Sequence, residues 1–106
     1  MLQECGRKDE AIASYKRALH IKPEFVEALN NLGNIFKELG RHAEAIDCYK
    51  ESLKIDPGSC EVLFNLGVAL VDLDRRNLAV GCYRRALQIN PNFADAHYAL
   101  GTLLSG

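Results

Sequence analysis

The sequence predicts an all-α protein built from about three repeats, each of which is a pair of antiparallel helices. Three prolines, Pro23, Pro57 and Pro91, lie 34 residues apart, and the residues between them keep the same phase. Within each unit, apolar and small residues recur three or four positions apart, which is the spacing of one face of a helix. A fixed period of this length is typical of stacked supersecondary units, so we expect a solenoid.

Each unit is predicted to hold a first helix and a second helix with a turn between them. The first helix carries leucine, glycine and phenylalanine on one face, and the second carries alanine and tyrosine at helical spacing, as in Leu32, Gly33, Phe36, Ala45 and Tyr49. Small residues at Ala45 and Ala79 predict a close approach of two helices. Gly6 and Gly40 are expected to end first helices in the left-handed conformation, and Asp74 takes that place in the next unit.

The second break in each unit is the proline column. Asp56-Pro57 and Asn90-Pro91 predict a capping side chain directly before a proline in the first turn of the next helix. Lys22-Pro23 keeps the proline and lacks such a cap.

The repeat register divides residues 1–106, which we expect to form a single domain, into four parts. These are the end of one repeat at 1–22, complete repeats at 24–56 and 58–90, and the first helix of a further repeat at 92–104. The two outer parts lack partner helices, so both are expected to expose apolar side chains: Ile12, Tyr15 and Leu19 at one end, Leu100, Leu103 and Leu104 at the other. Surface of this kind tends to find a partner, and head-to-tail self-association through the two ends is therefore predicted.

The combination of period, Leu-Gly in the first helix, Ala and Tyr in the second, and proline at the join resembles the tetratricopeptide repeat (TPR) family across essentially the whole chain. The resemblance implies a right-handed superhelical solenoid whose first helices line a concave groove that binds an extended peptide. Asn30-Asn31-Leu32-Gly33 and Phe64-Asn65-Leu66-Gly67 also resemble, more weakly, the superhelical TPR arrays of protein O-GlcNAc transferases.

Composition narrows the class of protein further. No apolar run approaches the length of a membrane span, and no secretion signal is visible at the N-terminus. The four cysteines, Cys5, Cys48, Cys60 and Cys82, lack metal-ligand spacing and are predicted to be small, half-buried residues in a reducing compartment. We therefore expect a cytoplasmic or nucleocytoplasmic chain that has no membrane contact and binds no metal or other cofactor.

Catalysis is not expected in this segment. His20 and His42 fall at helix ends and are predicted to be solvated, whereas His97 shares a column with two leucines and is predicted to be half-buried. No histidine lies at ligand spacing from a cysteine or carboxylate, and the glycines follow the repeat and form no phosphate loop.

Charge separates the two kinds of helix. The predicted first helices hold seven acidic residues against Lys37 alone: Glu4, Glu24, Glu27, Glu38, Glu61, Asp72 and Asp95. Two columns of acids would run along the array, one formed by Glu27, Glu61 and Asp95, the other by Glu4, Glu38 and Asp72. This field favours a basic peptide as partner, although a solubilising surface explains the same pattern.

The candidate peptide site lies beside these acids. By resemblance to the O-GlcNAc transferase arrays, the amides of Asn31 and Asn65 would hydrogen-bond the main chain of a bound peptide. The neighbouring columns add aromatic and amide groups that suit a peptide backbone: Asn30, Phe64 and Tyr98, then Asn34. The alternative is that both asparagines bond neighbouring helices and hold the stack together.

Two other partners are disfavoured. TPR domains that grip a chaperone's C-terminal carboxylate use two amides, which Asn34 and Asn65 match, and three cations, where this chain has Asn30, Asp95 and Ala99. The bases of the second helices are interrupted by acids and lack interleaved aromatics, so no nucleic acid is expected as partner.

The sequence therefore predicts a protein-interaction scaffold that binds a peptide or partner segment in its groove. One alternative is a structural or self-associating spacer of a longer TPR array. Another is the substrate-targeting arm of a glycosyltransferase whose catalytic domain lies elsewhere.

Overall fold

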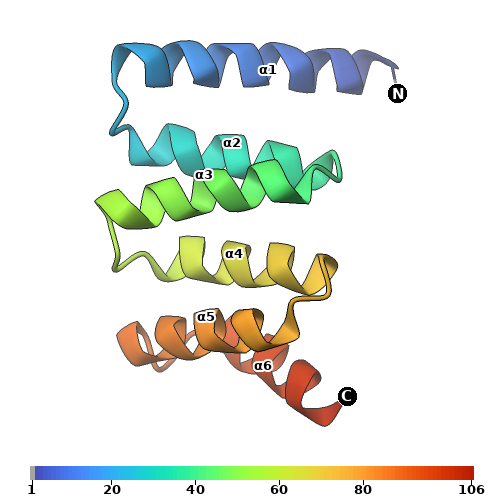
Figure 1. The fold of residues 1–106 in the computed structure, drawn as a ribbon, viewed down its shortest axis with the longest axis vertical. Coiled ribbons are helices and arrows are strands. Elements are labelled where there is room, and N and C mark those ends of the chain that lie inside the picture. Colours follow the sequence, from blue (N-terminus) through green and yellow to red (C-terminus); the bar gives the residue numbers. More distant parts are fainter. Residues whose placement is uncertain (1) are drawn as a thin grey trace.

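The computed structural model describes the backbone of residues 2–106 and the side chains from Gly6 onward, and this part of the chain forms six α-helices (Figure 1). In chain order they are α1 (Leu2–Ile21), α2 (Val26–Glu38), α3 (His42–Ile55), α4 (Cys60–Asp72), α5 (Arg76–Ile89) and α6 (Ala94–Ser105). The prediction of an all-α solenoid is confirmed.

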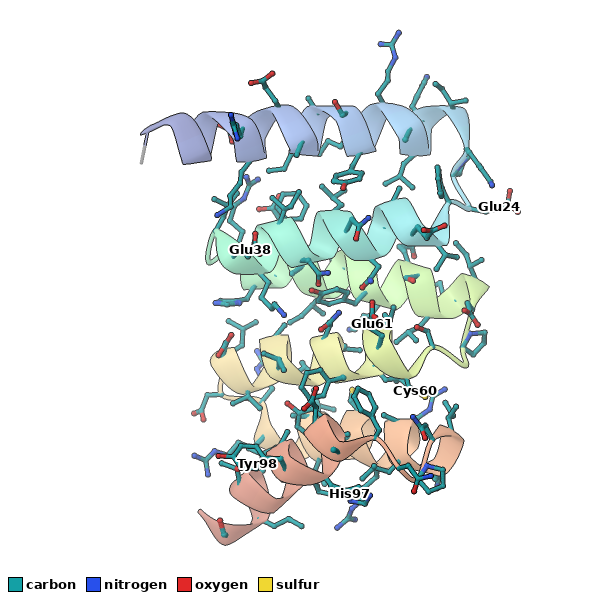
Figure 2. All side chains as sticks on the ribbon, turned by 180° about the vertical axis from the view of Figure 1, so that it is seen from behind. Glu24, Glu38, Cys60, Glu61, His97 and Tyr98 are labelled. Atoms are coloured by element: carbon teal, nitrogen blue, oxygen red, sulfur yellow. The ribbon has the colours of Figure 1, made fainter. Side chains whose placement is uncertain are left out.

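The molecule measures 39 × 31 × 20 Å, and the helices stack along its longest dimension. The first helices, α2, α4 and α6, face the viewer in Figure 2, and the second helices, α3 and α5, face the viewer in Figure 1. Extensive contacts join α2 to α3 and α4 to α5, and α3 packs against α4, so the core runs through every layer of the stack. We call the side formed by α2, α4 and α6 the first-helix face, and the side formed by α3 and α5 the second-helix face.

The close contact within each pair is a tyrosine ring against a glycine. A Cβ atom added to Gly33 would lie 2.7 Å from Cε1 of Tyr49, and one added to Gly67 would lie 2.5 Å from Cε1 of Tyr83. Both tyrosines are buried, and the predicted burial of Ala45 and Ala79 is confirmed, since both are fully buried (0% exposed). The glycines therefore let each second helix approach its first helix closely.

The turns between first and second helices adopt the predicted left-handed conformation. Gly40 has φ of 77° and Asp74 has φ of 59°. The N–H of Arg41 donates to the carbonyl of Phe36 at 2.8 Å, and that of Gly40 to the carbonyl of Lys37 at 3.0 Å, which is the Schellman pattern. The same pattern follows α4, so both turns satisfy the last carbonyls of the preceding helix.

The predicted helix end at Gly6 is wrong, because α1 runs without a break from Leu2 to Ile21. Continuing α1 through Gly6 adds a backbone hydrogen bond for each residue fixed. A glycine in a helix interior costs only about 1 kcal/mol relative to alanine.

The predicted place of the prolines in the first helical turn is also wrong. Asp56, with φ of −131°, ends α3, while α4 begins at Cys60 and is capped by the Ser59 hydroxyl, which accepts from the N–H of Val62 at 3.3 Å. A residue before proline is disfavoured in the helical region, so the preceding helix ends there. Pro23 and Pro91 each occupy the second position of a hydrogen-bonded β-turn.

The two ends of the stack expose less apolar surface than predicted. Ile12 is buried, with 8% exposed, because α1 lies against α2 and turns this side chain into the main core. Four more of the six residues are half-buried at its edge: Tyr15, Leu19, Leu100 and Leu103. Leu104 alone among the six is exposed, at 61%.

We expect Gly67→Ala to destabilise the protein by about 1–3 kcal/mol, because the new methyl group would overlap the buried ring of Tyr83. Gly101 occupies the same repeat position in α6 but has open space around it, so Gly101→Ala should leave stability unchanged or raise it by up to about 1 kcal/mol. Urea unfolding of both variants measures the difference. Equal stabilities would contradict the contact.

Burial also predicts how stability depends on alkaline pH. Burial raises the pKa of the Cys48 thiol to about 11, raises that of Tyr83 to about 12, and raises that of Tyr49 as well. The folded protein therefore holds these protons more tightly than the unfolded chain, whose thiol and phenol pKa values are about 8.5 and about 10. The contribution is complete below those values and is lost as pH rises through the folded values, so the thermal midpoint should fall progressively above about pH 9.

Tyr83→Phe provides a matched control for this pH dependence. It removes one buried ionisable group whose hydroxyl has no hydrogen-bond partner among the described side chains. Stability at pH 7 should stay close to that of the parent, and the alkaline loss should become smaller. An unchanged alkaline loss would exclude Tyr83 as a contributor.

Candidate functional site

The candidate site occupies the first-helix face, where the side chains of α2, α4 and α6 come together because equivalent residues recur once per repeat. Figure 2 shows this face, with Glu38, Glu61 and Tyr98 labelled on its three helices. Its two halves differ in chemistry. Polar groups join α2 to α4, and an apolar hollow lies between α4 and α6.

A chain of hydrogen bonds connects the polar half. Nδ2 of Asn65 donates to Oδ1 of Asn30 at 3.4 Å, and Nδ2 of Asn30 donates to Oε1 of Glu61 at 3.0 Å. Asn65 is half-buried, whereas Asn31 is exposed and makes no side-chain hydrogen bond within the described part of the chain. The two predicted peptide-binding amides thus differ: Asn65 already bonds a neighbouring helix, and Asn31 points to open surface.

Asn34 is held from the second helix. The buried hydroxyl of Tyr49 donates to its Oδ1, so this amide presents its NH₂ group to the surface. One repeat later the column holds Val68, and the hydroxyl of Tyr83 is left with no partner among residues 6–106.

An apolar hollow of about 210 Å³ results between α4 and α6. Its lining comes from both helices and from the tyrosine ring below them: Val68, Val71, Asp72, Tyr83, Tyr98, Ala99, Thr102 and Leu103. Tyr98 is 80% exposed on the rim, and Asp72 adds a carboxylate there. The sequence signal for this hollow was the loss of amides in two columns, where Val68 replaces Asn34 and Ala99 replaces Asn65.

Phe64 is placed differently from its column neighbours Asn30 and Tyr98. Its ring centroid lies 5.7 Å from that of Tyr83 and 5.4 Å from that of Phe93, and the side chain is half-buried. Phe64 therefore supports the floor of the first-helix face and offers only part of its ring to a ligand.

The acidic columns meet different surroundings. Glu27, Glu61 and Asp95 are exposed, and Glu61 is oriented by Asn30. In the second column, Glu38 lies 3.9 Å from Nζ of Lys8, and Asp72 lies 3.7 Å from Nδ1 of His42.

Lys8 of α1 therefore partly compensates Glu38 in the second column, and the first column carries the larger share of free negative charge. Glu4 lies outside the described side chains, and Glu24 lies in the turn before α2, not in a helix as predicted.

The histidines correct two predictions. His42 is half-buried against α4, with Nδ1 beyond hydrogen-bond distance of Asp72, because α3 packs on the next unit. His97 is exposed, and its Nε2 lies 2.8 Å from the carbonyl oxygen of Pro91. No other described element covers that side of α6, so the leucine column is not buried there.

Three of the four cysteines fit the prediction of small packing residues, since Cys48 is buried and Cys60 and Cys82 are half-buried free thiols. Cys5 lies outside the described side chains. The described side chains contain no group of three or more His, Cys, Asp or Glu residues placed to hold a metal ion. None of the helices in residues 2–106 has the length and apolarity needed to cross a membrane.

Comparison with known families identifies the class of protein. One family pattern, described as tetratricopeptide repeat, matches residues 26–59, and a second, described as TPR repeat, matches residues 1–40 and 71–105. The chain belongs to the tetratricopeptide repeat family. Its fold and the paired first and second helices agree with that assignment.

Solved structures show the same architecture. Two crystal structures of MamA are each 33% identical, with TM-scores of 0.89 and 0.88, and cover 97% of this chain. The chain spans 60% and 56% of those two MamA chains. The first TPR of Spaghetti (RPAP3), bound to the HSP90 peptide SRMEEVD, is 22% identical, with a TM-score of 0.90 over 96% of this chain and 81% of its own. A search of curated proteins gave no match.

Proposed function

We propose that the first-helix face binds an extended peptide segment of a partner protein and that this segment of the chain performs no catalysis. The observation that carries the proposal is the apolar hollow between α4 and α6, which lies beside exposed acidic and amide side chains. A hollow of about 210 Å³ suits one large apolar side chain, and flanking polar groups suit a peptide backbone. The bound peptide in the RPAP3 structure supports this use of the fold.

The partner we infer is basic. Glu27, Glu61 and Asp95 repeat along the face, and Asp72 lies on the rim of the hollow. A row of like charges attracts an oppositely charged segment and repels an acidic one. The clamp for a chaperone's carboxylate needs cations where this chain has Asn30, Asp95 and Ala99, so an acidic tail is not the partner we propose.

Asn31 and Asn65 are proposed to recognise the peptide main chain. Asn31 is exposed and uncommitted, and the carbonyl oxygen of Asn65 stays available while its NH₂ group bonds Asn30. Amides offer both donors and acceptors, so they can bond a peptide backbone with little dependence on its side chains. Asn30, Asn34, Phe64 and Tyr98 complete the proposed contact surface.

Two other roles remain as alternatives. A structural spacer that associates head to tail would use Leu104 and the half-buried residues at the two ends, and sedimentation at rising concentration would detect it. A targeting arm of a glycosyltransferase would use the same first-helix face, and a catalytic domain on the same polypeptide would distinguish it. The head-to-tail spacer does not account for an apolar hollow on this face.

We expect a lysine-rich peptide that contains one phenylalanine to bind more tightly than the acidic peptide SRMEEVD, because Glu27, Glu61 and Asp95 attract positive charge. Affinity should fall as ionic strength rises through the screening range. Charge reversal to lysine at these three positions should weaken the basic peptide about tenfold. Fluorescence anisotropy with labelled peptides measures both effects.

The matched control reverses three exposed acids elsewhere, at Asp9, Glu10 and Glu51, with the same change in net charge. This variant should retain most of the affinity for the basic peptide. If the two triple variants weaken binding equally, or if both peptide types bind alike at low salt, the acids of the first-helix face do not select the partner.

Alanine substitutions separate binding from stacking at the two asparagines. Asn31→Ala should lower peptide affinity about fivefold, because it removes the hydrogen bonds proposed between this amide and the peptide. The thermal midpoint should stay unchanged, because Asn31 bonds no other described side chain. Asn65→Ala should lower both affinity and stability, because it also removes the bond to Asn30. Calorimetry and thermal melts on the two variants test this. Full affinity in Asn31→Ala would remove that residue from the site.

A further inference from the structure

Two surface sites at equivalent repeat positions on the second-helix face, one repeat apart, differ in the side chains that surround a shared arginine. In the earlier one, the guanidinium carbon of Arg41 lies 4.7 Å from the ring centroid of Phe36. The guanidinium also donates two hydrogen bonds to the carboxylate of Glu44, one of them from an NH₂ group to Oε2 at 2.7 Å. Nζ of Lys16 lies 5.9 Å from the same ring. This place is therefore closed by an aromatic ring, a cation and a carboxylate of the chain itself.

Two replacements open the later place. The positions of Phe36 and Glu44 are taken by Leu70 and Leu78, while the arginine is kept as Arg75. In the described part of the chain, Arg75 makes no ion pair or hydrogen bond with another side chain. The guanidinium of Arg75 therefore has neither an aromatic ring nor a carboxylate at the positions from which Phe36 and Glu44 contact Arg41.

A hollow of about 210 Å³ lies there, and we call it the outer pocket. Its apolar wall includes Ile46, Leu70, Leu73 and Leu78. Leu73 is 39% exposed and Leu78 is 59% exposed, so apolar surface is open to a ligand.

Two cations and one acid complete the lining of the outer pocket: Lys50, Arg75 and Asp47. The balance of charge in the lining is therefore positive. This sign is opposite to that of the acidic columns on the first-helix face.

We propose that the outer pocket binds a partner-protein segment that presents an aromatic side chain next to an aspartate or glutamate. The partner's ring packs on Leu70 and Leu78 beside Arg75, as the ring of Phe36 lies beside Arg41 in the earlier repeat. Its carboxylate pairs with Arg75 as Glu44 pairs with Arg41, and Lys50 adds a second cation. The chemistry of the occupant is thus set by what the equivalent place already contains.

A peptide carboxylate fits this site better than a nucleic-acid strand. Single-stranded nucleic acid also offers rings and negative charge, but it needs a track of cations along its backbone. Asp47 in the lining and Glu51 on the same helix interrupt such a track. A single carboxylate can pair with Arg75 and Lys50, and the ring beside it can pack on the apolar wall of the outer pocket.

The experiment uses three amidated five-residue peptides, Gly-Glu-Phe-Gly-Ser, Gly-Gln-Phe-Gly-Ser and Gly-Glu-Ala-Gly-Ser, titrated into ¹⁵N-labelled protein at low salt. We expect the first to shift the amide resonances of Leu73, Arg75 and Leu78. The second and third should each bind about two- to fivefold more weakly, because one loses the charge and the other the ring. Equal affinities for all three, or no shifts at these residues, would overturn the proposal.

Variants taken from the earlier repeat provide matched controls. Leu70→Phe with Leu78→Glu rebuilds the internal partners of Arg75 and should abolish binding at the outer pocket. Arg75→Gln, at an exposed position, should weaken the first peptide to the level of the second. Phe36→Leu with Glu44→Leu should open a second site and produce new shifts around Arg41.

Thermal melts verify that each variant is folded. If Leu70→Phe with Leu78→Glu is folded and binds as the parent does, the proposal is wrong. Tighter binding of a short oligothymidine than of the first peptide would also overturn it. Because the outer pocket lies on the second-helix face, shifts at Tyr98 report separately on the first-helix face.

Discussion

The packing of a tyrosine ring against a glycine within each helix pair is the contact on which the rest of the structure depends. Gly33 and Gly67 leave no room for a Cβ atom beneath Tyr49 and Tyr83. The tyrosines in turn are among the largest fully buried side chains, and each lies between a first helix and the following unit. A close-packed interior transmits any change at this contact to its neighbours, so the spacing of the whole stack follows from it.

The same contact determines how the first-helix face differs between repeats. The hydroxyl of Tyr49 donates to Asn34, and one repeat later Tyr83 and Val68 line the apolar hollow together. Where the amide is present, the hydroxyl is satisfied and the surface is polar. Where valine is present, an apolar hollow lies above the ring. A single column thus makes one half of the face polar and the other half apolar.

Departures from the repeat, more than the repeat itself, carry the functional proposals. The conserved phase explains why the helices stack, and it requires small residues, tyrosines and left-handed turns at fixed positions. Val68 in place of Asn34, and Leu78 in place of Glu44, contribute nothing to that requirement. Each removes a polar partner from a neighbouring side chain and leaves a surface whose chemistry an external segment can complete. The two faces differ in sign of charge, so the partners proposed for them differ in charge as well.

The sequence by itself determined the helix pairs, the left-handed turns at Gly40 and Asp74 and the buried alanines, because these depend on local pattern repeated at a fixed period. It also placed Asn31 and Tyr98 on exposed surface of first helices. Only the tertiary structure decided that Asn30 bridges α2 and α4, that Ile12 is buried, that His97 is exposed and that α1 continues through Gly6. These outcomes depend on which element packs against each residue, and residues of one column meet different neighbours at the ends of the stack and in its middle.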